Sequence, residues 1–158
     1  MNSAIDVKAK NVSLIVEGER KLNLSDYLGK NIILYFYPKD DTPGCTVEAN
    51  DFKENISKFE KLNSIVIGVS KDSLESHAKF KKKYGLPFIL ASDYEGKTCD
   101  QYGVWGEKSM YGKKYFGINR STFLIDSQGI VKKVWRKVSV KGHVEEVLKE
   151  LKDLNKES

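Results

Sequence analysis

The chain has 158 residues, of which 40% are hydrophobic and 31% are charged. This composition excludes a disordered chain and a fibrous repeat, and the length predicts a single domain over residues 1–158. The longest apolar run, Ile32 to Tyr37, is far shorter than the roughly 20 residues that cross a bilayer. No apolar segment typical of a secretory signal follows the N-terminus, so we expect a cytoplasmic protein with no membrane partner.

The formal net charge is +5, and nearly all of the positive charge comes from lysine; Arg20, Arg120 and Arg136 are the only arginines. Arginine is the better residue for bidentate contacts to bases and phosphates. The densest basic run, Lys81 to Lys83, lies in a helical pattern. It is either a solvated helix face or a patch for an acidic partner, and the first interpretation is favoured. We therefore expect no nucleic-acid partner.

Six runs of apolar and β-branched residues predict strands, and several are continuous enough to be buried on both faces. The last two flank Asp126 to Gly129, a turn sequence that predicts a β-hairpin. In chain order the runs are Val12–Val16, Ile32–Tyr37, Ile65–Val69, Phe88–Ala91, Ser121–Ile125 and Ile130–Arg136.

Three helical patterns lie between or after these runs. One starts near Ala49, with Phe52, Ile56, Phe59 and Leu62 on one face; a second follows a possible cap at Asp72 and ends at Gly85; the third is C-terminal, from Val144 to Leu154. A short helix is also expected around Cys99. The order of elements predicts an α/β protein with a thioredoxin-like fold, a central mixed sheet flanked by helices.

Cys45 is the residue with the strongest chemical signal. Thr42 is a good helix N-cap and Pro43 suits the first helical position, so Cys45 falls in the first turn of a helix that follows a central strand. Backbone N–H groups and the positive end of the helix dipole favour a thiolate there. The alternative is a small buried cysteine, which is the commoner role of a lone thiol. The turn sequence around it favours the reactive thiol.

The residues Pro38, Thr42 and Cys45, with the spacing Pro-x-x-x-Thr-x-x-Cys, form a motif that resembles the peroxiredoxin active-site signature. The setting YFYPKDDTPGCT, together with the stretch from Ser92 to Gly129, is similar to the bacterioferritin-comigratory (Q-type) subfamily. The resemblance runs from about Leu24 to the end of the C-terminal helix.

The resemblance implies a role for each catalytic residue. Cys45 would be the peroxidatic cysteine, and Thr42 would offer its hydroxyl to the thiolate and the peroxide. Pro38 would shield the sulfur from water, and Arg120 would be the site arginine. The backbone of Gly44 and Cys45, with Arg120, could hold the charge that develops on the leaving oxygen. No metal, haem or flavin cofactor is implied.

Three further residues keep two interpretations each. Glu48 either orients Arg120 or complements the helix dipole. Trp105 resembles an aromatic residue beside the pocket, but core packing is equally compatible with it. Cys99 is either structural or a resolving thiol, because Asn50 stands where many members of the subfamily carry their second cysteine. The subfamily's usual N-terminal segment is also replaced, here by AKNVSLIV.

We therefore expect a thiol peroxidase that acts on hydrogen peroxide or organic hydroperoxides and is recycled by thioredoxin or another thiol, as a monomer or weak dimer. A redox sensor based on Cys45 oxidation is the alternative. A dithiol oxidoreductase would need a CxxC motif, and a cysteine hydrolase would need a nearby histidine. His77 and His143 do not look well placed for that role.

Overall fold

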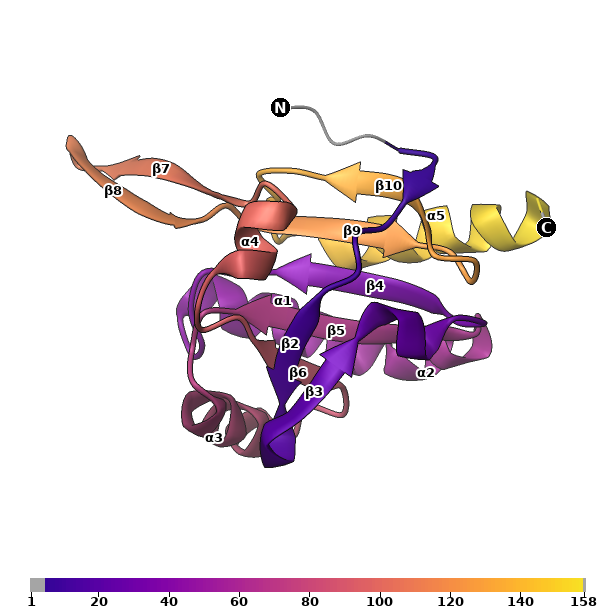
Figure 1. The fold of residues 1–158 in the computed structure, drawn as a ribbon, viewed down its shortest axis with the longest axis horizontal. Helices are drawn as coiled ribbons and strands as arrows, with labels where there is room; N and C mark the ends of the chain where they lie inside the picture. Colours follow the sequence, from indigo (N-terminus) through magenta and orange to yellow (C-terminus); the bar gives the residue numbers. More distant parts are fainter. Residues whose placement is uncertain (1–4, 158) are drawn as a thin grey trace.

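The computed structural model describes residues 5–157, except for the side chains of Ser13 and Glu157. Its main sheet has eight strands in the order β1-β10-β9-β4-β5-β6-β2-β3 (Figure 1). The strands are β1 (Val7–Lys8), β2 (Ser13–Val16), β3 (Arg20–Asn23), β4 (Asn31–Phe36), β5 (Ser64–Ser70), β6 (Ile89–Ser92), β9 (Ser121–Ile125) and β10 (Ile130–Trp135).

The centre of the sheet is mixed. β4 pairs parallel with β5 and β5 parallel with β6, whereas β9 runs antiparallel to β4. Every residue of β4 and β9 is buried, including the polar Asn31, Ser121 and Thr122 at their starts, and the apolar run that follows Asn31 predicts this for β4. The six predicted strands are all present within about one residue of the expected bounds, and β9 and β10 form the expected hairpin. The predicted α/β class with a central mixed sheet is confirmed.

The helices divide between the two faces of the sheet. They are α1 (Pro43–Glu54), α2 (Ile56–Lys61), α3 (Leu74–Tyr84), α4 (Lys97–Gln101) and α5 (His143–Glu157), with short 3-10 turns at Glu17–Glu19 and Leu24–Tyr27. α1, α2 and α5 lie behind the sheet in Figure 1, and α4 lies in front of it with the β2–β3 ribbon. None of the helices among residues 5–157 is long and apolar enough to span a bilayer.

Alternate residues of β4 enter two separate hydrophobic clusters. Ile33, Tyr35 and Tyr37 pack with Cys45 and the apolar sides of α1, α3 and α5. The intervening residues of β4 pack on the other face with Cys99 and with residues of β2 and β3. Because successive side chains of a strand point to opposite faces, the sheet separates the two cysteines.

The helix boundaries differ from the predictions in two places. The single helix expected through Leu62 is divided at Asn55, where α1 ends and α2 begins. The cap of α3 is Ser73, whose hydroxyl accepts from the backbone of Ser76, and not Asp72. Asp72 instead accepts from the backbone N–H of Asp40. Gly85, with φ of 60°, ends α3 in the left-handed conformation as expected.

Three strands besides β1 were not predicted. β3 extends the sheet beyond β2, and β7 (Trp105–Met110) and β8 (Lys113–Ile118) form a separate two-stranded hairpin. The hairpin projects from the body of the molecule at the upper left of Figure 1. Its sequence is rich in lysine, glycine and aromatic residues and lacks a buried face, so no alternating pattern marked it.

Candidate active site

Cys45 lies in the first turn of α1, at the end of the loop that follows β4. Thr42 occupies the N-cap position with an extended backbone, and Pro43 is the first helical residue, as the sequence predicted. The first N–H groups of a helix have no hydrogen-bond partner within the helix, and those of α1 lie at the end of the helix that carries Cys45. Cys45 is only 2% exposed. Its sulfur therefore sits in a site from which bulk water is largely excluded.

Arg120 joins the sulfur to a buried carboxylate. It directly precedes β9, and its Nη2 donates to Cys45 Sγ over 3.2 Å while its Nη1 donates to Glu48 Oε1 over 2.6 Å. Glu48 thus pairs with Arg120, and the dipole interpretation is not needed to explain it. The single guanidinium is fixed by the carboxylate and aimed at the sulfur, which is the orientation a thiolate requires.

Burial and neighbouring charges have opposite effects on the pKa values of Glu48 and Arg120. Burial raises the pKa of Glu48 from 4.5 to about 7, although Arg120 opposes the rise. Burial lowers the pKa of Arg120, but the charges of Glu48 and Cys45 outweigh it and the net shift is upward. Glu48 Oε2 and Tyr35 Oη are buried without a hydrogen-bond partner among the described residues. Keeping the Arg120–Glu48 ion pair buried beside the thiol therefore costs folding free energy.

The other residues of the motif lie around the same helix turn. Gly44 is in close contact with Arg120, because a Cβ built at this position would be 3.2 Å from Nη2. Thr42 donates its hydroxyl to the carbonyl of Lys39 over 2.8 Å. Its hydroxyl hydrogen is thus engaged, so, contrary to expectation, Thr42 does not donate to Cys45, and its oxygen is left to accept a hydrogen bond from an incoming O–H group. Pro38 is partly buried at the start of the loop.

Among the described residues, Trp105 and Cys99 take no part in the hydrogen bonds that join Cys45, Arg120 and Glu48. Trp105 is 36% exposed and the Nζ of Lys71 is 4.2 Å from its ring centroid, so the core-packing interpretation was wrong. Its role beside the pocket stays a prediction. Cys99 is fully buried in α4, where burial, followed by Asp93, raises the pKa of its thiol far above the ordinary range. Such a thiol is a poor nucleophile.

The two histidines are engaged elsewhere. His143 is buried with its Nε2 2.8 Å from Thr122 Oγ1, and burial lowers its pKa to about 4. It is therefore a neutral side chain that packs against Trp135. His77 lies on α3 and bonds to Asp40. These contacts give neither ring the role of a general base for Cys45.

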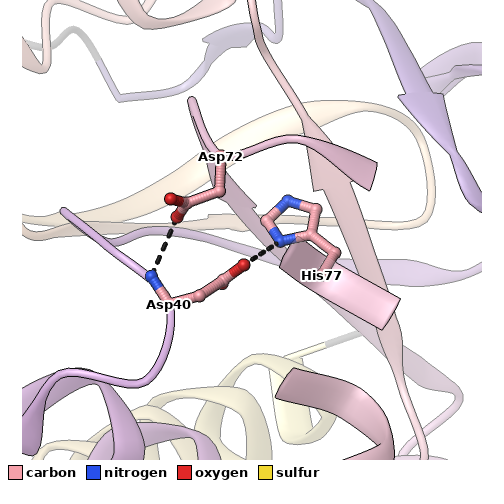
Figure 2. Close-up of side chains that lie close together, drawn as sticks. All are labelled: Asp40, Asp72 and His77. Carbon is pink, nitrogen blue, oxygen red and sulfur yellow. Dashed lines mark hydrogen bonds and ion pairs between the residues drawn. The ribbon is translucent and has the colours of Figure 1, made fainter. Parts of the chain in front are cut away.

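The loop from Tyr37 to Thr42 is fastened to α3 by a buried network that the sequence did not indicate (Figure 2). Asp40 accepts from Tyr37 Oη at 2.5 Å and from Ser76 Oγ at 2.7 Å. It also accepts from His77 Nδ1 at 2.7 Å, the contact drawn in Figure 2. The other ring nitrogen of His77 is 3.0 Å from the carbonyl of Ala91. Both nitrogens face acceptors, an arrangement that fits the protonated ring.

Asp40, Asp72 and His77 also bring three potential metal ligands within 4.8 Å of one another. The donor atoms are already used, however: Asp40 Oδ2 bonds to His77 and Ser76, and Asp72 Oδ2 bonds to Ser70 and to the backbone of Asp40. We therefore interpret this cluster as an ion pair within a hydrogen-bond network. It fixes the loop that carries the site to α3, because Asp40 and His77 are 37 residues apart in sequence.

His77→Gln is expected to lower the free energy of unfolding by about 3 kcal/mol, because it leaves the carboxylate of Asp40 buried without its charge partner. Denaturant unfolding measures the effect. Adding Asp40→Asn to the same variant removes the uncompensated charge and should recover part of the loss. Equal unfolding midpoints for His77→Gln and the wild type would contradict the ion pair.

Comparison with known proteins assigns the family. A profile of the AhpC/TSA family matches residues 2–134. The chain is 51% identical to Peroxiredoxin Bcp of Bacillus subtilis (strain 168) over 98% of this chain and 99% of that protein. It is 41% identical to Peroxiredoxin Bcp of Escherichia coli (strain K12), over 92% and 93% respectively. The chain belongs to the AhpC/TSA family.

Within this family it is a peroxiredoxin, a thiol peroxidase. Its fold matches a PrxQ mutant from Xylella fastidiosa with a TM-score of 0.92 and 40% identity, over 98% of this chain and 99% of that one. The bacterioferritin comigratory protein of Xanthomonas campestris, studied for alkyl peroxide reduction, matches with a TM-score of 0.89 and 40% identity, over 97% and 98%. The expected thioredoxin-like fold and the Q-type resemblance are confirmed for this peroxiredoxin.

Proposed function

We propose that this peroxiredoxin reduces hydrogen peroxide and organic hydroperoxides with Cys45 as the peroxidatic thiolate. The observation that carries the proposal is the guanidinium of Arg120, which contacts Cys45 Sγ while Glu48 holds it in position. A cation next to the sulfur favours the thiolate over the thiol. The activity of the Xanthomonas relative toward alkyl peroxides supports organic hydroperoxides as part of the substrate range.

The reaction is a displacement at oxygen. The thiolate of Cys45 attacks one peroxide oxygen, an S–O bond forms and the O–O bond breaks. The leaving oxygen takes the electron pair, collects a proton and departs as water or an alcohol, while Cys45 becomes a sulfenic acid. Negative charge moves from sulfur to the leaving oxygen, and Arg120 with the N–H groups of Gly44 and Cys45 is placed to stabilise it.

Thr42 and Pro38 complete the proposed site. Because the hydroxyl of Thr42 already donates to Lys39, its oxygen can accept the O–H of a bound peroxide and so direct the reacting oxygen toward sulfur. Pro38 at the start of the loop limits the access of water. We give Glu48 a positioning role, since its contact with the site runs through Arg120.

We further propose that the sulfenic acid is resolved by an external thiol such as thioredoxin, in a one-cysteine cycle. Cys45 and Cys99 belong to core clusters on opposite faces of β4, so a disulfide within one chain would require both clusters to open. Both are free thiols in the structure. A reducing compartment, for which we propose the cytoplasm, would keep them so and supply the reductant.

Cys99→Ala is expected to retain thioredoxin-supported turnover within about twofold of the wild type, because Cys99 takes no part in the cycle. Turnover is measured with thioredoxin and, in parallel, with a small monothiol. Collapse of the thioredoxin-supported rate alone, together with a Cys45–Cys99 linkage in peptide maps of the oxidised wild type, would refute the one-cysteine cycle.

Mass measurement after one equivalent of peroxide tests the proposal as a whole. The expected product is a single added oxygen on Cys45, removed by thioredoxin, with Cys99 unchanged. Oxidation of Cys45 without catalytic turnover in the presence of thioredoxin would instead favour a redox sensor that changes a partner contact.

A further inference from the structure

The β7–β8 hairpin exposes several large aromatic and apolar side chains to solvent. Tyr111 is 97% exposed, Phe116 64%, Met110 56% and Tyr115 41%. Within residues 5–157 the two strands pair only with each other, and the hairpin extends away from the main sheet (Figure 1). Aromatic residues and methionine are enriched in protein interfaces, and exposed groups of them mark contact sites.

The base of this hairpin is joined to the active site. The backbone N–H of Asn119 donates to the carbonyl of Val104 over 2.7 Å, closing the ribbon one residue before Arg120. Lys108 donates to the carbonyl of Ile118 over 3.0 Å. Burial and the charge of Arg120 lower the pKa of Lys108, while Cys45 opposes the shift. The base of the hairpin is therefore adjacent in the chain to Arg120, which contacts Cys45, so a protein bound along the hairpin would approach the side of the molecule that carries the cysteine.

The charge of the hairpin indicates which kind of protein it would bind. It carries Lys108, Lys113 and Lys114 against Glu107 alone, in a chain whose net charge is +5. A second copy of the chain would bring like charges together, whereas an acidic partner would be attracted. The apolar side chains spread over a projecting ribbon, and a broad protein surface matches this shape better than the tail of a peroxide does.

We propose that the β7–β8 hairpin is the docking surface for an acidic dithiol protein that reduces oxidised Cys45. The inference rests on the proposed peroxidase cycle and names the partner of its second half. One thiol of the partner attacks the sulfenic sulfur, a mixed disulfide forms and water leaves. The second thiol then attacks the partner's own sulfur in that disulfide, which releases Cys45 as a thiol and leaves the partner as a disulfide.

The charge of the hairpin is tested with the double variant Lys113→Glu/Lys114→Glu. Both side chains are exposed, as are those of the control pair Lys149→Glu/Lys152→Glu on α5, which changes the net charge equally. Each variant is first oxidised and then mixed rapidly with reduced thioredoxin of net negative charge, and the rate of its reduction is measured. At low ionic strength the hairpin variant should react about tenfold more slowly than the control, and the difference should shrink in salt. Equal rates for the two double variants would overturn the docking surface.

The apolar part is tested with Tyr111→Ser/Phe116→Ser. This variant should lose thioredoxin reactivity at every ionic strength but be reduced by dithiothreitol as fast as the wild type. Slower oxidation by a long-chain alkyl hydroperoxide, with unchanged thioredoxin reactivity, would assign the hairpin to the substrate and refute the proposal. Oxidation is measured first without any reductant, so a wild type that peroxide does not oxidise at Cys45 refutes the peroxidase cycle itself.

Discussion

Replacing Cys45 with serine is expected to reduce peroxide consumption to the rate of the protein-free reaction while leaving the fold intact. A serine hydroxyl stays protonated at neutral pH and does not displace oxygen from a peroxide. Serine fills nearly the same volume, and its oxygen can accept the hydrogen bond that Arg120 gives to sulfur. Peroxide loss, measured with an excess of thiol reductant, reports the activity, and unfolding by denaturant reports the fold.

Cys99→Ala is the matched control for this substitution, since it removes the other thiol from the chain. Undiminished peroxide consumption by Cys45→Ser under the same reductant would end the assignment of Cys45 as nucleophile. A variant that has lost its cooperative unfolding transition would instead point to a mainly structural thiol.

Arg120→Met is expected to slow the oxidation of Cys45 by about a hundredfold, the scale of losing one strong donor to the developing charge. Alkylation of Cys45 at neutral pH should also slow, because the thiolate loses the cation that contacts it. Stopped-flow oxidation and the rate of alkylation at a fixed neutral pH measure the two effects. Arg20→Met, an exposed arginine on β3, removes the same charge away from the site.

Glu48 explains why this variant should still fold. Its pKa in the folded protein is about 7, above the ordinary 4.5, and Arg120 is the group that holds it from rising further. Without the guanidinium the buried carboxyl takes up a proton at neutral pH and remains as a neutral acid. In the wild type the raised pKa of Glu48 contributes more stability near pH 5 than near pH 8, because the carboxyl loses its proton as the pH rises through 7; the lowered pKa of His143 acts in the opposite direction. Equal rates of oxidation and alkylation in Arg120→Met and the wild type would remove Arg120 from the site.

The central fold could be predicted because its signals are local. The strands β4, β5 and β9 are rich in apolar and β-branched residues, and Gly85 marks the end of α3 where the structure has it. The hairpin β7–β8 lacked such a signal, because its side chains are largely exposed on both faces and no burial pattern constrains them.

The site was predictable only in part for a similar reason. The first turn of α1 follows from Thr42, Pro43 and Cys45, which are neighbours in sequence. The contact between Asp40 and His77 joins residues 37 apart, and no spacing rule connects them. His77 was not expected to act as a base for Cys45, which agrees with its contacts, but the pattern of α3 could have shown that it falls on the buried side with Phe80.

The sheet between Cys45 and Cys99 affects how long the oxidised protein survives. In the proposed one-cysteine cycle, Cys99 does not reach oxidised Cys45, so the sulfenic acid waits for a collision with a second molecule and its lifetime depends on the concentration of reductant. During that wait another peroxide competes for the same sulfur and converts it to a sulfinic acid, which simple thiols do not reverse. The fraction of molecules inactivated per turnover therefore rises with the ratio of peroxide to reductant.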